Sequence, residues 1–408
     1  MNVQQFRERM ESSLTQGIHQ GIFPGGAVSI LRKGAPAVTV CMGKTSYGHD
    51  GRPVHSQTLY DMASLTKVMV TLPLILISVQ EGKLSLTDSV TIYLPELASA
   101  NDQERKGQIK IIHLLTHTSG LPAWRPYFLL GKNREDYLRL IANESMLGAP
   151  GRSVVYSDLG FMLLGFLLER IWDEDLDALA KRQIFEPSRM LHTSYLPLEQ
   201  TRQQGMDIAA TEKGNAFEQE MAVTFLSELE LAEARHPLAL EWQQALTGYG
   251  WREEVISGTV HDCNAHYGLE GVSGHAGLFS TLADTERYMH IWTSGKASVQ
   301  LDPTLCTLAT RSLTDHSIHR RGLGWIISPT GGSLEQLAAG CSGGDLVSEC
   351  AFGHTGFTGT SIWSDPARDV TLITLTNRVH PVASPLIGAW RTAHHNRLFS
   401  VIKPDHTS

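Results

Sequence analysis

Strand-forming segments stand at both ends of this chain, with a long helical stretch between them. Residues 27–31 and 37–42 are β-rich runs joined by Lys33-Gly34-Ala35-Pro36, which predicts an antiparallel hairpin. Strand signals return only at 324–328, 359–364 and 370–376. The pattern therefore predicts one antiparallel sheet that is assembled from distant segments of the chain.

Helical spacing accounts for most of the remaining chain. Phe6, Met10, Leu14 and Ile18 recur every four residues and predict a surface helix over 3–21. From 64 to about 274 the pattern is mainly helical, and a last helix is expected over 384–401. The helices predicted inside the middle stretch are 65–81, 111–117, 137–143 and 159–173.

Three local features carry further expectations. Asp158 stands just before the helix predicted at 159–173 and could cap it. The acidic run 217–233 predicts an exposed helix, because a charge run usually marks a solvated face. The glycine-rich stretch 331–344 predicts a mobile loop.

Charge and cysteine content exclude several classes of function. The formal net charge of −8 over 408 residues, with no basic run, argues against a nucleic-acid surface. Five scattered cysteines without a CxxC pair favour a reduced compartment and give zinc no scaffold. The N-terminus lacks the apolar core of a signal peptide, and the apolar run 68–79 is too short to span a membrane. With Met1 as the natural start, we expect a cytoplasmic protein without membrane or nucleic-acid partners; the oligomeric state stays open.

Ser64-Leu65-Thr66-Lys67 is the first candidate for catalytic chemistry. A helix places residues three apart on one face, so the Ser64 hydroxyl and the Lys67 amine can meet. Serine at its ordinary pKa is a poor nucleophile and needs a neighbouring base. Apolar neighbours such as Val68 and Met69 would desolvate Lys67 and favour loss of its proton near neutral pH. By itself the motif is weak, since a pair at this spacing also arises by chance.

Two further segments supply candidate partners. Tyr156 precedes a predicted helix and could carry a proton if nearby cations lower its pKa; simple packing at a helix start is the alternative. His354-Thr355-Gly356 precedes the strand at 359–364. A small-residue segment beside a sheet edge can present the N–H of Phe357, with that of Ser64, to a developing oxyanion; an ordinary turn is the alternative.

Competing sites have weaker support. Gly340-Cys341-Ser342-Gly343-Gly344 matches Gly-x-Ser-x-Gly, but a nucleophile elbow needs a strand before it and a helix after it. His113 and His117 share a predicted helical face, yet the glutamate of His-Glu-x-x-His is missing, so a structural role is favoured over a metal site. Trp124 and Tyr127 could line a cleft mouth or simply pack.

The order and spacing of the three catalytic segments resemble class C β-lactamases, family VIII esterases and related penicillin-binding proteins. Other blocks agree with this resemblance, which extends from about Phe23 to Asn377 and is weakest across 200–260. The agreeing blocks are Leu114-Leu115-Thr116-His117-Thr118-Ser119-Gly120-Leu121-Pro122, Gly274-His275-Ala276-Gly277-Leu278-Phe279-Ser280-Thr281 and Thr376-Asn377-Arg378-Val379-His380-Pro381.

The resemblance implies a mechanism. Ser64 would attack a carbonyl carbon and form an acyl-enzyme, while Lys67 and Tyr156 move its proton. The backbone N–H groups of Ser64 and Phe357 would hold the oxyanion. The substrate-binding positions would be Asp158, His354, Thr355, Gly356 and Trp124, and neither a metal nor an organic cofactor would take part.

The resemblance also implies a fold. It is α/β of the α+β type: an antiparallel sheet flanked by helices on both faces, with a mostly helical region and the active-site cleft between the two parts. On this basis we expect a discontinuous sheet domain from 1–63 and 275–408 and a helical domain from 64–274. Residues 200–260 would shape the cleft rim.

Two departures from the β-lactamase pattern point toward esters. Asp158 stands where those enzymes usually carry asparagine, and an ionised carboxylate can only accept hydrogen bonds. If Asp158 touches Lys67 it would favour the ammonium, which makes Tyr156 the stronger candidate base. His354 replaces a lysine, and a neutral imidazole holds a carboxylate less firmly. We therefore expect a carboxylesterase-like serine hydrolase acting on a small acyl compound. A DD-peptidase, a β-lactamase, an acyltransferase and a non-catalytic sensor remain alternatives.

Overall fold

The computed structural model describes residues 3–98, 101–198, 205–231, 238–293 and 299–402. Its main sheet has six strands in the order β2-β1-β8-β7-β6-β5, and every neighbouring pair is antiparallel. The strands are β1 (Gly25–Arg32), β2 (Ala35–Gly43), β5 (Ile326–Ile327), β6 (Phe352–Thr355), β7 (Ser361–Asp365) and β8 (Val370–Thr376). The predicted sheet from both ends of the chain is confirmed, because β1 pairs along its length with β8.

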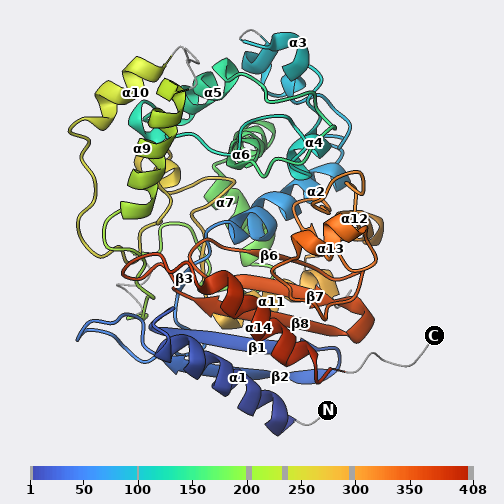
Figure 1. Ribbon diagram of the computed structural model, residues 1–408. Helices are drawn as coiled ribbons and strands as arrows, with labels where there is room; N and C mark the ends of the chain where they lie inside the picture. Colours follow the sequence, from blue (N-terminus) through green and yellow to red (C-terminus); the bar gives the residue numbers. More distant parts are fainter. Residues whose placement is uncertain (1–2, 99–100, 199–204, 232–237, 294–298, 403–408) are drawn as a thin grey trace.

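Alternating residues of the strands face two separate cores, so both faces of the sheet are covered. Val28 of β1 and Leu372 of β8 pack with residues of the first and last helices on one face of the sheet. Ala27 and Ile373 belong to the larger core, which covers the other face. This two-residue period is the one that a strand imposes on its side chains. Figure 1 shows the sheet with α1 and α14 on one side and the helical elements on the other.

The α-helices occupy most of the predicted positions, and a second, two-stranded sheet joins β3 (Tyr60–Asp61) to β4 (Phe279–Ser280). The helices are α1 (Val3–His19), α2 (Leu72–Gln80), α3 (Gln103–Lys106), α4 (Ile111–Leu115), α5 (Arg134–Asn143), α6 (Asp158–Trp172), α7 (Leu176–Ala180), α9 (Ala216–Leu231), α10 (Ala239–Leu246), α11 (Leu282–Thr293), α12 (Pro303–Ala309), α13 (Leu334–Ala339) and α14 (Ile387–Phe399). The assignment of sheet and helical parts to two domains stays a prediction.

Three local expectations were wrong. Ser157 caps α6, because its hydroxyl accepts the N–H of Gly160, and Asp158 is the first helical residue. Helix α9 is not a solvated helix throughout: Glu218, Ala222 and Leu226 recur every four residues on a buried face. The part of the acidic run beyond Leu231 lies outside the described residues. The stretch 331–344 contains helix α13, whose first turn is fixed by a capping box between Ser333 and Gln336.

The nucleophile segment is less regular than the predicted helix 65–81. It begins with a π-helical turn, Lys67–Thr71, and continues as α2, in which Pro73 has no N–H to donate to the preceding turn. π-helical turns are frequent at functional sites. Beside it lies α6, whose residues 159–168 are all buried, so this helix is a core element of the helical part.

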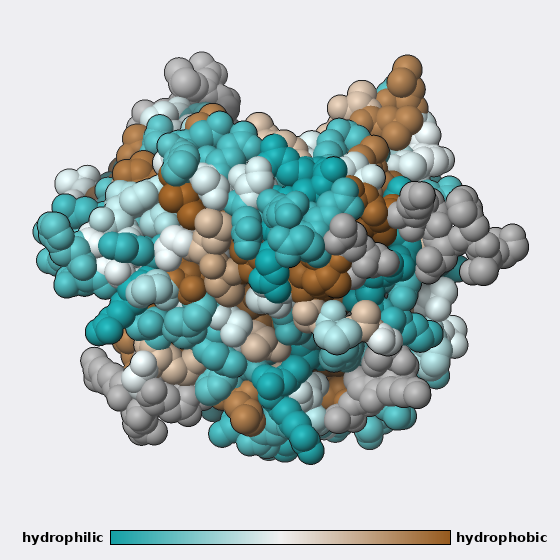
Figure 2. Space-filling view, turned by 90° about the horizontal axis from the view of Figure 1, so that it is seen from below, coloured by the Kyte–Doolittle hydropathy of each residue, from teal (hydrophilic) through white to brown (hydrophobic). Residues whose placement is uncertain are grey.

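The outer face below the sheet is mainly hydrophilic. Figure 2 shows this face with hydrophobic patches that are separated by polar residues. Helix α1 explains part of this pattern, since it buries Phe6, Met10 and Leu14 and turns its charged residues outward. None of the helices in the described part of the chain is both long and apolar enough to cross a bilayer.

Candidate active site

Ser64 lies in a tight turn between β3 and the π-helical turn. The residue before it, Ala63, has a φ of 45°, in the left-handed region that non-glycine residues rarely adopt. The Asp61 carboxylate holds this turn by accepting the N–H of Ala63 at 2.8 Å and that of His261 at 2.7 Å. The unusual backbone is therefore imposed by a buried carboxylate, and it turns the Ser64 side chain toward the main cleft.

Lys67 is completely buried and has three acceptors around its Nζ. The distances are 3.0 Å to Ser64 Oγ, 3.0 Å to the His275 carbonyl and 2.7 Å to Asp158 Oδ1. Ser64 Oγ and the His275 carbonyl accept hydrogen bonds from Lys67 Nζ, and Asp158 forms an ion pair with it. The predicted contact between Ser64 and Lys67 is present, and Asp158 touches Lys67 as considered from the sequence.

The charge state of Lys67 differs from the first expectation. Burial alone would lower the pKa of the Lys67 ammonium, but Asp158 and Tyr156 outweigh burial and raise the pKa above its ordinary value. Of the two expectations for Lys67, loss of its proton by desolvation and an ammonium favoured by Asp158, this direction agrees with the second. The raised pKa favours the ammonium form, which donates to Ser64 Oγ.

Tyr156 lies between two cations. Lys67 Nζ is 5.1 Å and Arg321 Cζ 5.3 Å from the centre of its ring. On a third side, the ring of His117 lies 4.4 Å away between centroids. His117 is fixed because its Nδ1 accepts the N–H of Ser157 at 3.0 Å. The nearby cations that the sequence argument required for Tyr156 are present.

His354 and Arg321 form the polar wall on the sheet side. His354 is 1% exposed, and burial lowers its pKa well below the ordinary value, so the imidazole is neutral. Its Nδ1 lies 2.9 Å from the Thr355 carbonyl and must carry the hydrogen, which leaves Nε2 as an acceptor. Nε2 of His354 and the Nε and Nη1 of Arg321 have no hydrogen-bond partner among the described residues.

Arg321 was missed by the sequence argument. It follows Arg320, and nothing in the local pattern separates the two residues. In the structure Arg320 pairs with Asp315, whereas Arg321 enters the cleft. The cleft therefore contains the cation that the replacement of lysine by His354 had appeared to remove.

Two backbone N–H groups are available beside Ser64. Among the described residues, neither the N–H of Ser64 nor that of Phe357 has an acceptor. The segment after β6 is tied to the nucleophile turn, since Thr358 Oγ1 donates to the Asp61 carbonyl at 2.6 Å and Thr360 Oγ1 to the Met62 carbonyl at 3.2 Å. This arrangement suits an oxyanion hole.

Gly356 allows the two segments to approach. A Cβ at this position would lie 2.5 Å from the Met62 carbonyl oxygen and 2.1 Å from Thr360 Oγ1. Gly356 itself lies behind the cleft wall, whereas Thr355 and Phe357 line it. The glycine therefore acts through the closeness of the backbone and not through contact with a ligand.

The cleft has a volume of about 510 Å³, within the usual range for small-molecule sites. Trp124 lines it, but Tyr127 is fully buried in the core and not at the mouth. Phe217 and Met221 of α9 also line it, so the region 200–260 does shape the cleft. The lining residues are Ala63, Ser64, Trp124, Tyr156, Asp158, Phe217, Glu218, Met221, His261, Asp262, Ala276, Arg321, Ile326, His354, Thr355 and Phe357.

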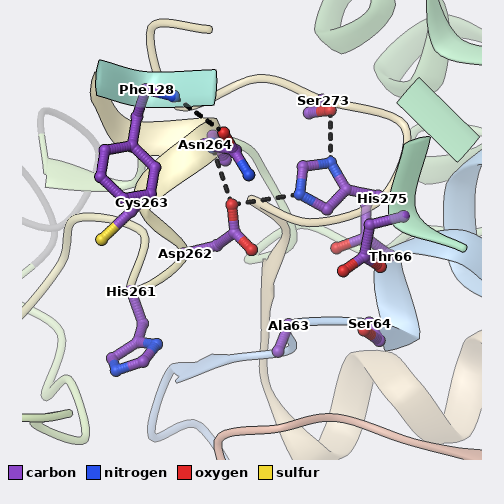
Figure 3. Close-up of polar contacts among 12 residues, drawn as sticks. Ala63, Ser64, Thr66, Phe128, His261, Asp262, Cys263, Asn264, Ser273 and His275 are labelled. Carbon is purple, nitrogen blue, oxygen red and sulfur yellow. Dashed lines mark hydrogen bonds and ion pairs between the residues drawn. The ribbon is translucent and has the colours of Figure 1, made fainter. Parts of the chain in front are cut away.

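The cleft lining also contains two acidic residues that the sequence did not indicate, Glu218 and Asp262. Figure 3 shows Asp262 joined to His275 by a dashed line, with His261 below Asp262. Burial raises the pKa of Glu218 well above its ordinary value, which favours its neutral form. Burial also opposes the charge of Asp262, yet His275 and two further partners hold its pKa at about 2. Asp262 is therefore the ionised acid of this pair.

The two competing sites do not form. Helix α4 ends at Leu115, and His117 has a φ of 57°. The expected shared helical face of His113 and His117 is therefore absent. Within the described ranges, no three His, Cys, Asp or Glu side chains are placed to hold a metal ion. The element before Ser342 is helix α13, whereas a nucleophile elbow requires a strand at that place. The Ser342 hydroxyl accepts a hydrogen bond from Trp363 Nε1 at 3.3 Å.

Comparisons with known proteins agree with this geometry. The β-lactamase family model matches residues 3–397, so the chain belongs to the β-lactamase family. A protein of Salmonella agona named as a putative D-alanyl-D-alanine carboxypeptidase is 31% identical over 349 residues, covering 81% of this chain and 72% of the relative.

Solved structures support the fold. EstCE1, described as a hydrolase with promiscuous acyltransferase activity, superposes with a TM-score of 0.71 at 20% identity and covers 97% of this chain and 99% of its own. A class C β-lactamase from Rhodobacter sphaeroides superposes with a TM-score of 0.67 at 17% identity, covering 96% of this chain and 99% of its own. The predicted family and fold are confirmed.

Proposed function

We propose that this protein is a serine hydrolase that forms an acyl-enzyme on Ser64 and prefers small carboxylic esters. One observation carries the proposal: Ser64 Oγ lies 3.0 Å from the Nζ of a buried lysine, inside a cleft that also holds Tyr156 and two unused backbone N–H groups. A nucleophile, a proton acceptor and an oxyanion site are the three parts that acyl transfer requires.

The proton route follows from the charge of Lys67. The Lys67 ammonium donates to Ser64 Oγ, so the hydroxyl hydrogen of Ser64 is directed to another acceptor. We assign that acceptor to Tyr156, whose ring centre lies 5.1 Å from Lys67 Nζ and 5.3 Å from Arg321 Cζ. As Ser64 attacks the ester carbonyl, Tyr156 takes its proton and passes it to the leaving alcohol. Water then attacks the acyl-enzyme by the same route in reverse.

The oxyanion of each tetrahedral intermediate would lie between the N–H groups of Ser64 and Phe357. Their fixed orientation requires no rearrangement during the reaction, and one such donor typically contributes about 10²- to 10³-fold in rate. Lys67 adds a nearby positive charge, while Asp158 holds Lys67 in place at 2.7 Å.

The preference for esters rests on Asp158. Because its carboxylate is engaged by Lys67, it cannot donate to the amide carbonyl of a penicillin. An ester needs no such donor, and its alcohol is a better leaving group than an amine. The partner of the enzyme is then a small acyl compound.

A second candidate is a DD-carboxypeptidase, which one observation favours. Arg321 lines the cleft and has no carboxylate partner for its Nε and Nη1 among the described residues, so its guanidinium charge could pair with a substrate carboxylate. The name of the Salmonella agona relative agrees with this alternative.

The decisive experiment compares the wild type with Ser64→Ala on p-nitrophenyl butyrate. We expect a loss of roughly a thousandfold or more, as for removal of a covalent nucleophile. Ser342→Ala is the matched control and should keep wild-type rates. Equal activity of wild type and Ser64→Ala would contradict the proposal. A higher kcat/KM on an acyl-D-Ala-D-Ala peptide than on the ester would favour the second candidate, and one on nitrocefin a β-lactamase.

A further inference from the structure

A buried Asp–His–Ser chain lies directly behind the proposed nucleophile. Asp262 Oδ1 is 3.1 Å from Nε2 of His275, and Nδ1 of His275 is 2.7 Å from Ser273 Oγ (Figure 3). His275 and Ser273 are 1% and 2% exposed, so no substrate reaches them. This Ser–His pair is therefore excluded as a second nucleophilic centre. Its role is to position the residues to which it is bonded.

What it holds is the backbone segment beside the nucleophile helix. The His275 carbonyl accepts Lys67 Nζ at 3.0 Å, and the preceding Gly274 carbonyl accepts Thr71 Oγ1 at 2.6 Å. Both ring nitrogens of His275 are engaged, so the imidazole cannot rotate without breaking a hydrogen bond. The two hydrogen bonds on opposite sides of the ring fix His275, whose carbonyl accepts a hydrogen bond from Lys67 Nζ.

Asp262 also contributes charge. Its Oδ1 accepts the N–H of Ala265 at 2.8 Å as well as His275, while the side chain lines the cleft with 20% exposure. Lys67 is among the groups that help to keep Asp262 ionised. Such coupling is reciprocal, so the Asp262 carboxylate must in turn favour the Lys67 ammonium.

We propose that Asp262 is a positioning residue of this active site: through His275 it aims a carbonyl at Lys67, and its carboxylate is a second negative charge near the ammonium, after Asp158. Ser273 completes the clamp from the other side of the imidazole. The inference rests on the proposed function, because the role of Lys67 is defined there.

Other titratable groups face the same two side chains and must be accounted for. Around Asp262 they are His275, Lys67, Glu218, Cys263, Asp61 and Tyr137. Around Lys67 they are Asp158, Tyr156, Asp262, His117 and His354. Burial raises the pKa of Glu218, Cys263 and Tyr137, which favours the neutral form of each.

The test separates charge from geometry. In Asp262→Asn the amide oxygen can still accept from His275 and Ala265, but the negative charge is gone. We expect the alkaline limb of the kcat/KM profile for p-nitrophenyl butyrate to move to lower pH, because the ammonium is less stabilised, with KM unchanged. Asp262→Ala should move the limb in the same way and also lower kcat roughly tenfold, since a misplaced Lys67 weakens the reactive geometry.

Two further variants keep the test specific. Ser273→Ala loosens the clamp without removing charge, so kcat should fall and the limb should stay. Glu218→Gln makes the same acid-to-amide change in the same cleft wall, but on a neutral side chain, so the limb should again stay. Should Asp262→Ala not fold, Asp262→Asn decides.

The inference would be overturned if the alkaline limb of the kcat/KM profile were the same in Asp262→Asn as in the wild type. It would also be overturned if Glu218→Gln moved that limb as far as Asp262→Asn does. Its failure is distinguishable from failure of the proposed function. If Ser64→Ala retains wild-type activity, the function is wrong. If Ser64→Ala is inactive and the limb of Asp262→Asn stays, only the role of Asp262 is wrong.

Discussion

Replacing Asp158 by asparagine tests the charge state of Lys67. The carboxylate lies 2.7 Å from Nζ, Lys67 is 0% exposed and Asp158 is 18% exposed. Removing one partner of a buried pair typically costs about 3 to 5 kcal/mol of stability, because the other charge is left without a counterion. Since Asp158 is partly exposed and asparagine keeps an oxygen acceptor, we expect a loss near the lower end, about 3 kcal/mol at pH 6.

The pH dependence has a definite sign. The wild-type Lys67 has a raised pKa, so its contribution to stability is fully present below the unfolded-state value and is lost as pH rises through the folded-state value. In Asp158→Asn the carboxylate no longer opposes the effect of burial, so the pKa of Lys67 falls. As pH rises and Lys67 deprotonates, the variant therefore gains stability relative to the wild type. The difference in free energy of unfolding between the two proteins should therefore be largest at acidic to neutral pH and shrink at alkaline pH.

Urea unfolding at pH 6 and pH 9.5, together with the pH profile of p-nitrophenyl butyrate hydrolysis, measures both effects. We expect the alkaline limb of kcat/KM to move to lower pH in Asp158→Asn, because the required ammonium titrates earlier. An Asp302→Asn variant, which changes an exposed helix cap far from the cleft, controls for loss of charge alone. If stability and the alkaline limb of Asp158→Asn match the wild type, Lys67 is not held as an ammonium by Asp158 and the reasoning is refuted.

Three further predictions address other parts of the site. Tyr156→Phe should lower kcat by about 10² to 10⁴-fold, the usual contribution of a general base, with an unchanged unfolding midpoint; full activity would remove Tyr156 from the proton route. Gly356→Ala should lower kcat by roughly 100-fold and stability by about 1 to 3 kcal/mol, because its Cβ would lie 2.5 Å from the Met62 carbonyl oxygen; thermal unfolding and ester kinetics check this, and wild-type behaviour would contradict the close approach. Arg321→Ala should raise KM about tenfold or more for substrates with a free carboxylate but not for neutral esters, and equal effects on both would exclude a carboxylate-binding role.

The parts of the site that the sequence predicts are those with local spacing. Ser64 and Lys67 are three residues apart, and such a pair meets wherever a helical turn forms. The sheet was predictable because its strands are β-rich runs bounded by turn residues, as in the hairpin around Lys33-Gly34. The resemblance to the β-lactamase family then connected Ser64 with Tyr156 and Phe357, which no spacing argument could join.

The remainder depends on tertiary contacts. Arg321 and Arg320 are equivalent in sequence, and only the fold turns one of them into the cleft. Glu218 was assigned to a solvated face, but its carboxyl accepts the N–H of Cys263 and is buried. From the sequence, desolvation and a contact with Asp158 predict opposite charge states for Lys67, and only the fold shows that the contact forms.

The measurement that tests the central claim most directly is the site of covalent labelling by a fluorophosphonate. After labelling and trypsin digestion, tandem mass spectrometry should place the adduct on Ser64, in the peptide that ends at Lys67, and Ser64→Ala should take up no label. An adduct on Ser342, or a folded protein that accepts none, would contradict the account.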